Sequence, residues 1–200
     1  CMPRRMLVAM QMEEFMTRRY ELRFNRMKGC KEYRERHSLF TDYRPVTAEA
    51  VKSICFEAQL EGISAIEYDV QRYVDSRRVS HYWPIEEFLF DLPHWDGQDR
   101  IRALADCVPC ENKEWRDFFY IWFLSMVAHW LQMDREHANS TSPLLVGPQG
   151  CRKSSFCQSL LPPELRPYYV DGIDLGSRKD AEMALNRFAL INLDAVSYTH

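Results

Sequence analysis

The sequence of 200 residues lacks a long apolar run, a signal segment, a disulfide framework and a large excess of one charge. Its longest apolar stretch, residues 118–131, is shorter than the roughly 20 residues that a membrane-spanning helix needs. Residues 6–10 are too few for the apolar part of a signal peptide, because Gln11 and two glutamates soon follow. The seven cysteines are scattered and odd in number, which predicts reduced thiols. We therefore expect a cytoplasmic globular chain without a membrane partner.

Charge is unevenly distributed along the chain, although the net charge is only -3. Residues 1–36 contain ten Lys or Arg against five Asp or Glu, which gives this segment a charge of +5. If the segment contacts DNA, its phosphate contacts would come from Arg18, Arg19, Arg23, Arg26, Lys28 and Lys31. The alternative is that these side chains form a solvated face, so DNA is a hypothetical partner.

The most informative motif lies at residues 144–154, where an apolar run leads into a loop and then into a helix. Gly147, Lys153 and Ser154 occupy their places in the phosphate-loop signature G-x-x-x-x-G-K-[ST], but Arg152 replaces the last glycine. In such a loop backbone N–H groups surround an anion, the lysine contacts the outer phosphates, and the serine hydroxyl can ligate Mg²⁺. Arginine takes a left-handed conformation only at a cost, although its guanidinium could reach a phosphate. The alternative is a Gly-Pro turn before an ordinary helix.

The sequence around this loop predicts a parallel sheet with helices between its strands. We expect strands at residues 144–146, 168–170 and 188–193, and helices at residues 155–161 and 178–186. Asp194 follows the last strand, where a second Mg²⁺-organising residue of a phosphate-loop enzyme would lie. The predicted fold class is α/β, with an N-terminal α+β lobe at residues 1–80. The first half of a parallel-sheet P-loop NTPase domain would follow at residues 81–200.

These motifs define a candidate nucleotide site. The predicted nucleotide-binding residues are Gly147, Gly150, Cys151, Arg152, Lys153, Ser154 and Ser155. The expected cofactors are ATP and Mg²⁺, with Ser154 and Asp194 as the metal-organising residues. The sequence names no catalytic residue.

The front lobe shows a hairpin pattern followed by two helices. We expect a helix at residues 12–19, strands at residues 20–24 and 30–36, and a turn at residues 25–29. Thr47 should cap a helix that ends near Gly62, and Ser64 should open a second helix as part of a capping box. The two helices are compatible with a helix-turn-helix-like unit and equally with plain scaffold.

Several segments together resemble the virulence-associated protein E family of bacterial mobile elements. The resemblance lies in residues 92–100 with Trp95-Asp96-Gly97, and in residues 126–130, 137–140, 143–146, 150–157, 161–165 and 190–194. It implies a phosphate-loop ATPase similar to superfamily 3 helicases and to primase-helicases, active in DNA replication of a mobile element and assembled as a homo-oligomer. The alternatives are a truncated product that only binds nucleotide or DNA, and a regulatory NTPase that switches without unwinding.

The chain departs from that family pattern after Asp194. Ala195 stands where an acidic residue usually polarises the attacking water, and no sensor residue or arginine finger follows in the sequence. The chain also starts with Cys1, so we expect a fragment that binds ATP but hydrolyses it barely above background. If turnover is nevertheless rapid, Asp171 or Asp174 would be the group that positions the water.

Overall fold

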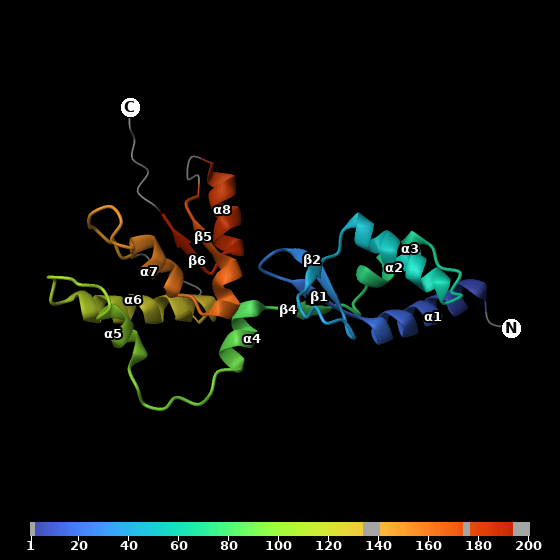
Figure 1. The fold of residues 1–200 in the computed structure, drawn as a ribbon, viewed down its shortest axis with the longest axis horizontal. Helices are drawn as coiled ribbons and strands as arrows, with labels where there is room; N and C mark the ends of the chain where they lie inside the picture. The colour runs from blue at the N-terminus through green and yellow to red at the C-terminus, as the bar shows by residue number, and fades with distance from the viewer. Residues whose placement is uncertain (1–2, 134–140, 174–176, 194–200) are drawn as a thin grey trace. The chain divides into compact units, whose positions relative to one another are not determined.

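The computed structural model describes residues 3–133, 141–173 and 177–193, and the chain divides into two compact units, Cys1–Pro84 and Ile85–His200 (Figure 1). The helices of the first unit are α1 (Arg4–Arg19), α2 (Ala48–Leu60) and α3 (Glu67–Val74). Its strands are β1 (Tyr20–Asn25), β2 (Cys30–Glu35), β3 (Arg44–Pro45) and β4 (Ser80–Tyr82), in the sheet order β3-β2-β1-β4. The hairpin of β1 and β2 is antiparallel, whereas β4 runs parallel to β1.

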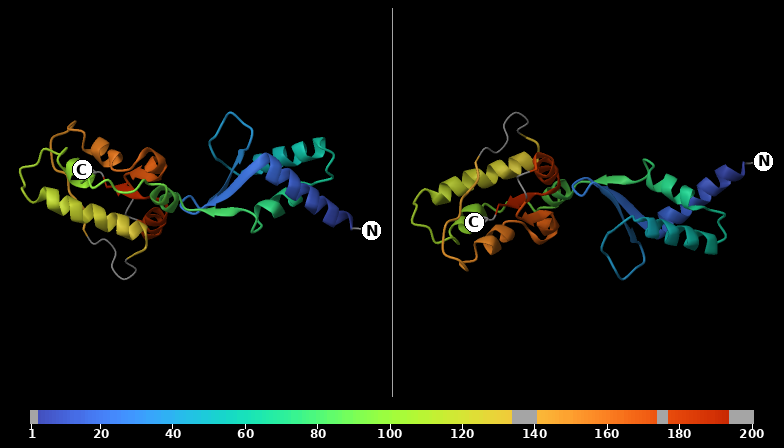
Figure 2. Two further views of the ribbon diagram at one scale, coloured as in Figure 1. Left: turned by 90° about the horizontal axis from the view of Figure 1, so that it is seen from below. Right: turned by 90° about the horizontal axis from the view of Figure 1, so that it is seen from above.

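The predicted hairpin is confirmed, and its alternation separates two faces of the sheet. Tyr20, Leu22 and Tyr33 pack into the core that α1, α2 and α3 build around Phe15. Gly29 closes the turn with a φ of 66°, a conformation that glycine adopts without steric cost. Helix α1 is longer than the sequence prediction, and Figure 2 shows that it leads directly into β1.

Helices α2 and α3 begin with different kinds of cap. Thr47 accepts a hydrogen bond from the backbone N–H of Ala50 at 3.2 Å, as predicted for the start of α2. The prediction that Ser64 opens α3 is wrong, because the helix begins at Glu67 and Asp69 accepts from the N–H of Ile66 at 3.1 Å. The side chain of Ala65 is buried in the core, which holds this connection in an extended form.

The second unit contains five helices, a 3₁₀ helix and two strands within the described residues. The helices are α4 (Pro84–Phe90, which begins at the last residue of the first unit), α5 (Arg100–Ala105), α6 (Trp115–Trp130), α7 (Lys153–Ser159) and α8 (Arg178–Arg187). The 3₁₀ helix η1 (Pro163–Tyr168) leads into β5 (Tyr169–Asp171), which pairs in parallel with β6 (Leu190–Asn192). Phe119 is the centre of an apolar cluster that also holds Leu160, the residue directly after α7, and Leu190 of β6.

Two of the three predicted strands are confirmed, together with the helix between them. The parallel pairing of β5 and β6 and the cap of α8 by Ser177 agree with the sequence patterns. The prediction of a buried strand at residues 144–146 is wrong. Leu144 is 84% exposed and Val146 is 87% exposed, and the segment is irregular. The physical reason is that a strand forms only beside a partner, and the described sheet pairs β5 only with β6.

The family-like segment around Trp95 forms an ordered turn. Asp96 forms a bidentate ion pair with Arg100, with distances of 2.7 and 2.6 Å, and Gly97 has a φ of 84°. The indole N–H of Trp95 donates to the carbonyl of Gln98 at 3.2 Å. Within the described ranges, none of the helices combines the length and apolar character that crossing a bilayer requires.

Candidate phosphate-binding site

The loop of the predicted phosphate site makes a tight turn into α7. Gly150 has a φ of 83°, and Arg152 has φ and ψ values of 64° and 30°, so both residues are left-handed. Arg152 is the N-cap of α7, and its carbonyl accepts the helical hydrogen bond from Phe156 at 3.0 Å. Arg152 therefore adopts a left-handed conformation, which glycine takes most easily, at the position of the last glycine in the G-x-x-x-x-G-K-[ST] signature.

Lys153 closes this loop from the inside. Its Nζ donates to the carbonyl oxygens of Gly147 at 2.9 Å and Pro148 at 3.0 Å, and it lies 3.6 Å from Sγ of Cys151. The ammonium is therefore held within the curve of the loop rather than extended into solvent. An anion that enters the loop would meet a positive charge that is already in place.

The other predicted residues fall into two groups. Gly147 and Cys151 approach each other closely, since a Cβ on Gly147 would lie 3.2 Å from the Cys151 sulfur. The side chains of Arg152, Ser154 and Ser155 are exposed at the start of α7. The structure therefore brings Gly147, Cys151 and Lys153 together and leaves the hydroxyl and guanidinium groups open to a ligand.

Replacing Arg152 with glycine should raise the free energy of unfolding of the second unit by about 0.5–1 kcal/mol. A left-handed residue with a Cβ costs roughly 1–2 kcal/mol, and glycine recovers part of this against an entropic cost of about 0.5–1 kcal/mol. Arg152→Ala is the matched control, because alanine removes the guanidinium but keeps the Cβ. Calorimetric unfolding measures the difference in stability between the variants. Equal free energies of unfolding for Arg152→Gly and Arg152→Ala would contradict the prediction.

A polar cluster lies at the carboxyl ends of β5 and β6. The hydroxyl of Tyr169 donates to Oδ1 of Asp171 at 2.6 Å, and Nδ2 of Asn192 donates to the same oxygen at 2.8 Å. Burial raises the pKa of Tyr169, and the carboxylate of Asp171 raises this pKa further. The sequence pointed to Asp171 only as a candidate for positioning water and gave no signal for Tyr169 or Asn192. Asp174, Asp194 and Ala195 lie outside the described residues.

The basic side chains proposed for DNA contact are mostly paired within the first unit. Ion pairs join Arg18 to Glu61, Arg19 to Glu57 and Glu61, Arg23 and Lys28 to Glu32, and Lys31 to Asp75. The guanidinium of Arg26 instead lies 4.5 Å from the ring centre of Trp83. Because carboxylates neutralise most of this cluster, it offers phosphates less positive charge than the sequence suggests, and DNA binding stays a prediction.

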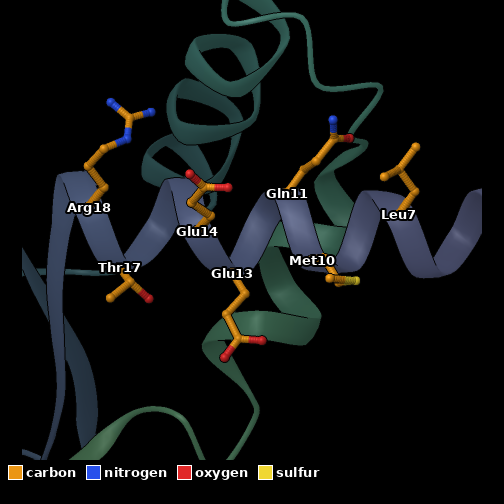
Figure 3. A pocket seen from close by; sticks show the side chains of 7 residues that line it. All are labelled: Leu7, Met10, Gln11, Glu13, Glu14, Thr17 and Arg18. Carbon is orange, nitrogen blue, oxygen red and sulfur yellow. The ribbon is translucent and has the colours of Figure 1, made fainter.

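A shallow hollow along α1 is also unsuited to phosphate (Figure 3). Its lining comes from one face of the helix and consists of Leu7, Met10, Gln11, Glu13, Glu14, Thr17 and Arg18. The lining contains two carboxylates, those of Glu13 and Glu14, and one guanidinium, that of Arg18. Arg18 already forms an ion pair with Glu61. The hollow is therefore no basic groove.

Comparison with known proteins identifies one related family. The family model described as the virulence-associated protein E-like domain matches residues 89–198, a range that includes the turn at Trp95, the loop at residues 147–152 and both described strands of the second unit. Neither the curated proteins nor the solved structures gave a match. The match confirms the resemblance inferred from the sequence.

Proposed function

We propose that this chain, which belongs to the virulence-associated protein E-like family, binds the phosphates of ATP with the loop at residues 147–155. Family membership follows from a match that covers more than half of the chain. The observation that carries the proposal is the ammonium of Lys153, which is held inside the loop by the carbonyls of Gly147 and Pro148. A cation held in place at a helix N-terminus is suited to a polyphosphate.

Each residue of the loop has a separate task in this proposal. The backbone of residues 147–152, including Gly150 and Cys151, surrounds the phosphates. Lys153 would neutralise the outer phosphates, and Arg152, an exposed residue at the end of the loop, would add a second charge. Ser155 has an exposed hydroxyl at the start of α7.

The start of α7 also offers a hydroxyl that could ligate a magnesium ion. The Ser154 hydroxyl is exposed directly after the lysine, and a hydroxyl at this place can ligate Mg²⁺ together with a carboxylate. Ser154 and Asp194 would hold the ion in our proposal. When it is bound with ATP, Mg²⁺ supplies charge compensation for the phosphate oxygens.

For the parent protein we propose a helicase-like ATPase that acts in replication of a bacterial mobile element. In it β5 and β6 would belong to a wider parallel sheet of the phosphate-loop type. DNA and further copies of the chain are its proposed partners. A fragment that binds nucleotide without turnover, or an NTPase that only switches, would use the same loop. Hydrolysis by this chain should be slow, because Ala195 offers no carboxylate to polarise water.

Affinity for adenine compounds should rise with the number of phosphates. We expect ATP to bind more tightly than ADP, ADP more tightly than AMP, and adenosine not to bind measurably, because the loop contacts phosphate oxygens. Titration calorimetry in the presence of Mg²⁺ measures the series. Inorganic triphosphate is the matched control ligand and should compete with ATP for the loop. Equal affinities for ATP and adenosine would overturn the proposal.

A further inference from the structure

Helix α1 carries apolar side chains on two faces, and the first unit covers only one of them. Met12, Phe15 and Met16 are buried in the core that α1 shares with α2 and α3. On the opposite face, Leu7 is 47% exposed and Met10 is 51% exposed. A surface helix normally turns a polar face to the solvent. Leu7 and Met10 therefore form a second apolar surface at the outside of the unit.

The hollow along α1 gives this face the form of a groove between two rows of side chains. Figure 3 shows Leu7, Gln11 and Glu14 on one side of the helix, and Met10 and Glu13 on the other. Neighbouring members of each row are three or four residues apart in the sequence. Rows with this spacing are the ridges of a helix surface, and the ridges of one helix pack into the groove of another. A second helix therefore fits the hollow.

The charges along α1 match those of a second copy of α1 that runs in the opposite direction. Arg4 precedes the apolar residues and Glu14 follows them, and both are exposed. Glu13 is paired with Arg78, but no ion pair among the described residues includes Arg4 or Glu14. A two-fold axis that brings Arg4 to Glu14 of the second copy also brings Glu14 to the second copy's Arg4. Parallel helices would instead place like charges together, which disfavours that direction.

The same register brings the apolar side chains of the two helices together. Leu7 lies at the level of Gln11 of the second copy when the charges face each other. Met10 then lies between that Gln11 and the second copy's Leu7, as a knob lies in a hole. The unbranched side chain of methionine adapts to such a gap. Leu7 and Met10 of both copies thus form one apolar centre with an ion pair at each end.

From this arrangement we infer that α1 is a self-association surface, through which two copies of the chain pair in antiparallel directions. The inference goes beyond the nucleotide site, and it gives a surface to the self-association that is part of the proposed function. It requires no nucleotide, because α1 belongs to the first unit. The contact covers about three helical turns, so the dimer should be weak and should depend on protein concentration.

Sedimentation equilibrium of the full chain without nucleotide tests the apolar centre. Wild type should form dimers as its concentration rises. Leu7→Glu should raise the dissociation constant of the dimer about tenfold or more, because it places a carboxylate in the apolar centre. Leu185→Glu is the matched control, since Leu185 is an exposed leucine of α8, and it should leave the dissociation constant unchanged.

A charge exchange tests the antiparallel direction. Arg4→Glu and Glu14→Arg should each raise the dissociation constant about tenfold, because each creates two like-charge contacts per dimer. The double variant restores two opposite-charge pairs and should dimerise as wild type does. This recovery cannot come from a loss of folding, and the charge variants decide the question if circular dichroism shows that Leu7→Glu is unfolded.

Three results would overturn the inference: a wild type that stays monomeric, self-association that Leu7→Glu leaves unchanged, or a double charge variant that dimerises no better than the single ones. Titration calorimetry with ATP separates this inference from the proposed nucleotide site. Arg4→Glu, Glu14→Arg and Leu7→Glu should all bind ATP as wild type does. Loss of dimerisation would leave the proposed ATP site intact, and a failure of wild type to bind ATP would leave the α1 surface intact.

Discussion

Replacing Lys153 with alanine should weaken ATP binding about ten- to hundredfold. Hydrogen bonds to charged groups contribute about 1.5–3 kcal/mol, and the Lys153 ammonium supplies such bonds to the outer phosphates in our proposal. The substitution also removes the contacts from Nζ to the carbonyls of Gly147 and Pro148 that hold the loop closed. Titration calorimetry with ATP and Mg²⁺ measures the loss.

Two control variants separate the effect of the lost positive charge from the effect of the lost contacts with the loop carbonyls. Lys179→Ala removes the same charge from an exposed position on α8 and should leave ATP affinity unchanged. Lys153→Gln keeps a donor for the loop carbonyls without the positive charge, so its affinity should lie between those of wild type and Lys153→Ala. Equal affinity of wild type and Lys153→Ala would remove the lysine from the site.

Replacing Glu32 with glutamine should destabilise the first unit by about 3 kcal/mol, the lower end of the cost of breaking a buried ion pair. The Glu32 side chain is only 1% exposed. It accepts from Arg23 at 2.9 Å, Lys28 at 2.9 Å and Asn25 at 3.2 Å. Glutamine retains the shape but leaves two cations without a carboxylate. Hydrogen exchange of the amides in β1 and β2 reports the stability of this unit separately from the second one.

The same carboxylate makes the first unit sensitive to acid. Burial by itself would raise the pKa of Glu32, but the hydrogen bonds from Lys28, Asn25 and Arg23 outweigh it and hold the pKa below its ordinary value. Its contribution is therefore complete above the unfolded-state pKa of about 4.3 and is lost as the pH falls through the lower folded-state pKa. In the Glu32→Gln variant, the free energy of unfolding of the first unit should therefore fall less steeply as the pH is lowered.

Glu35→Gln is the matched control on the same strand. Its carboxylate is 41% exposed and pairs with Arg44 at 3.1 Å. Exposed pairs of this kind contribute at most about 1 kcal/mol, so Glu35→Gln should change hydrogen exchange little. If Glu32→Gln and Glu35→Gln lowered the protection of the β1 and β2 amides equally, the burial of Glu32 would not be the cause of the destabilisation.

Features that depend on neighbouring residues were predictable from the sequence. Alternation of apolar and polar residues defined the β1–β2 hairpin, and Thr47 and Ser177 marked the starts of α2 and α8. Hydrogen bonds of these kinds join residues that are close in the chain, so their patterns are visible without a fold. The family resemblance likewise came from local motifs, and the match over residues 89–198 confirmed it.

The tertiary structure decided everything that depends on partners far apart in the chain. The apolar run at residues 144–146 has the composition of a buried strand, but no described strand pairs with it. Glu61 and Asp75, which neutralise Arg18 and Lys31, come more than 40 residues later in the sequence.

The candidate site shows the same division. The sequence by itself determined the positions of Gly147, Lys153 and Ser154, because their spacing is a local property of the loop. Only the tertiary structure brought the Asn192 amide to the carboxylate of Asp171, 21 residues away. The physical reason is that strand pairing and side-chain contacts depend on chain folding, which brings distant residues within hydrogen-bonding range.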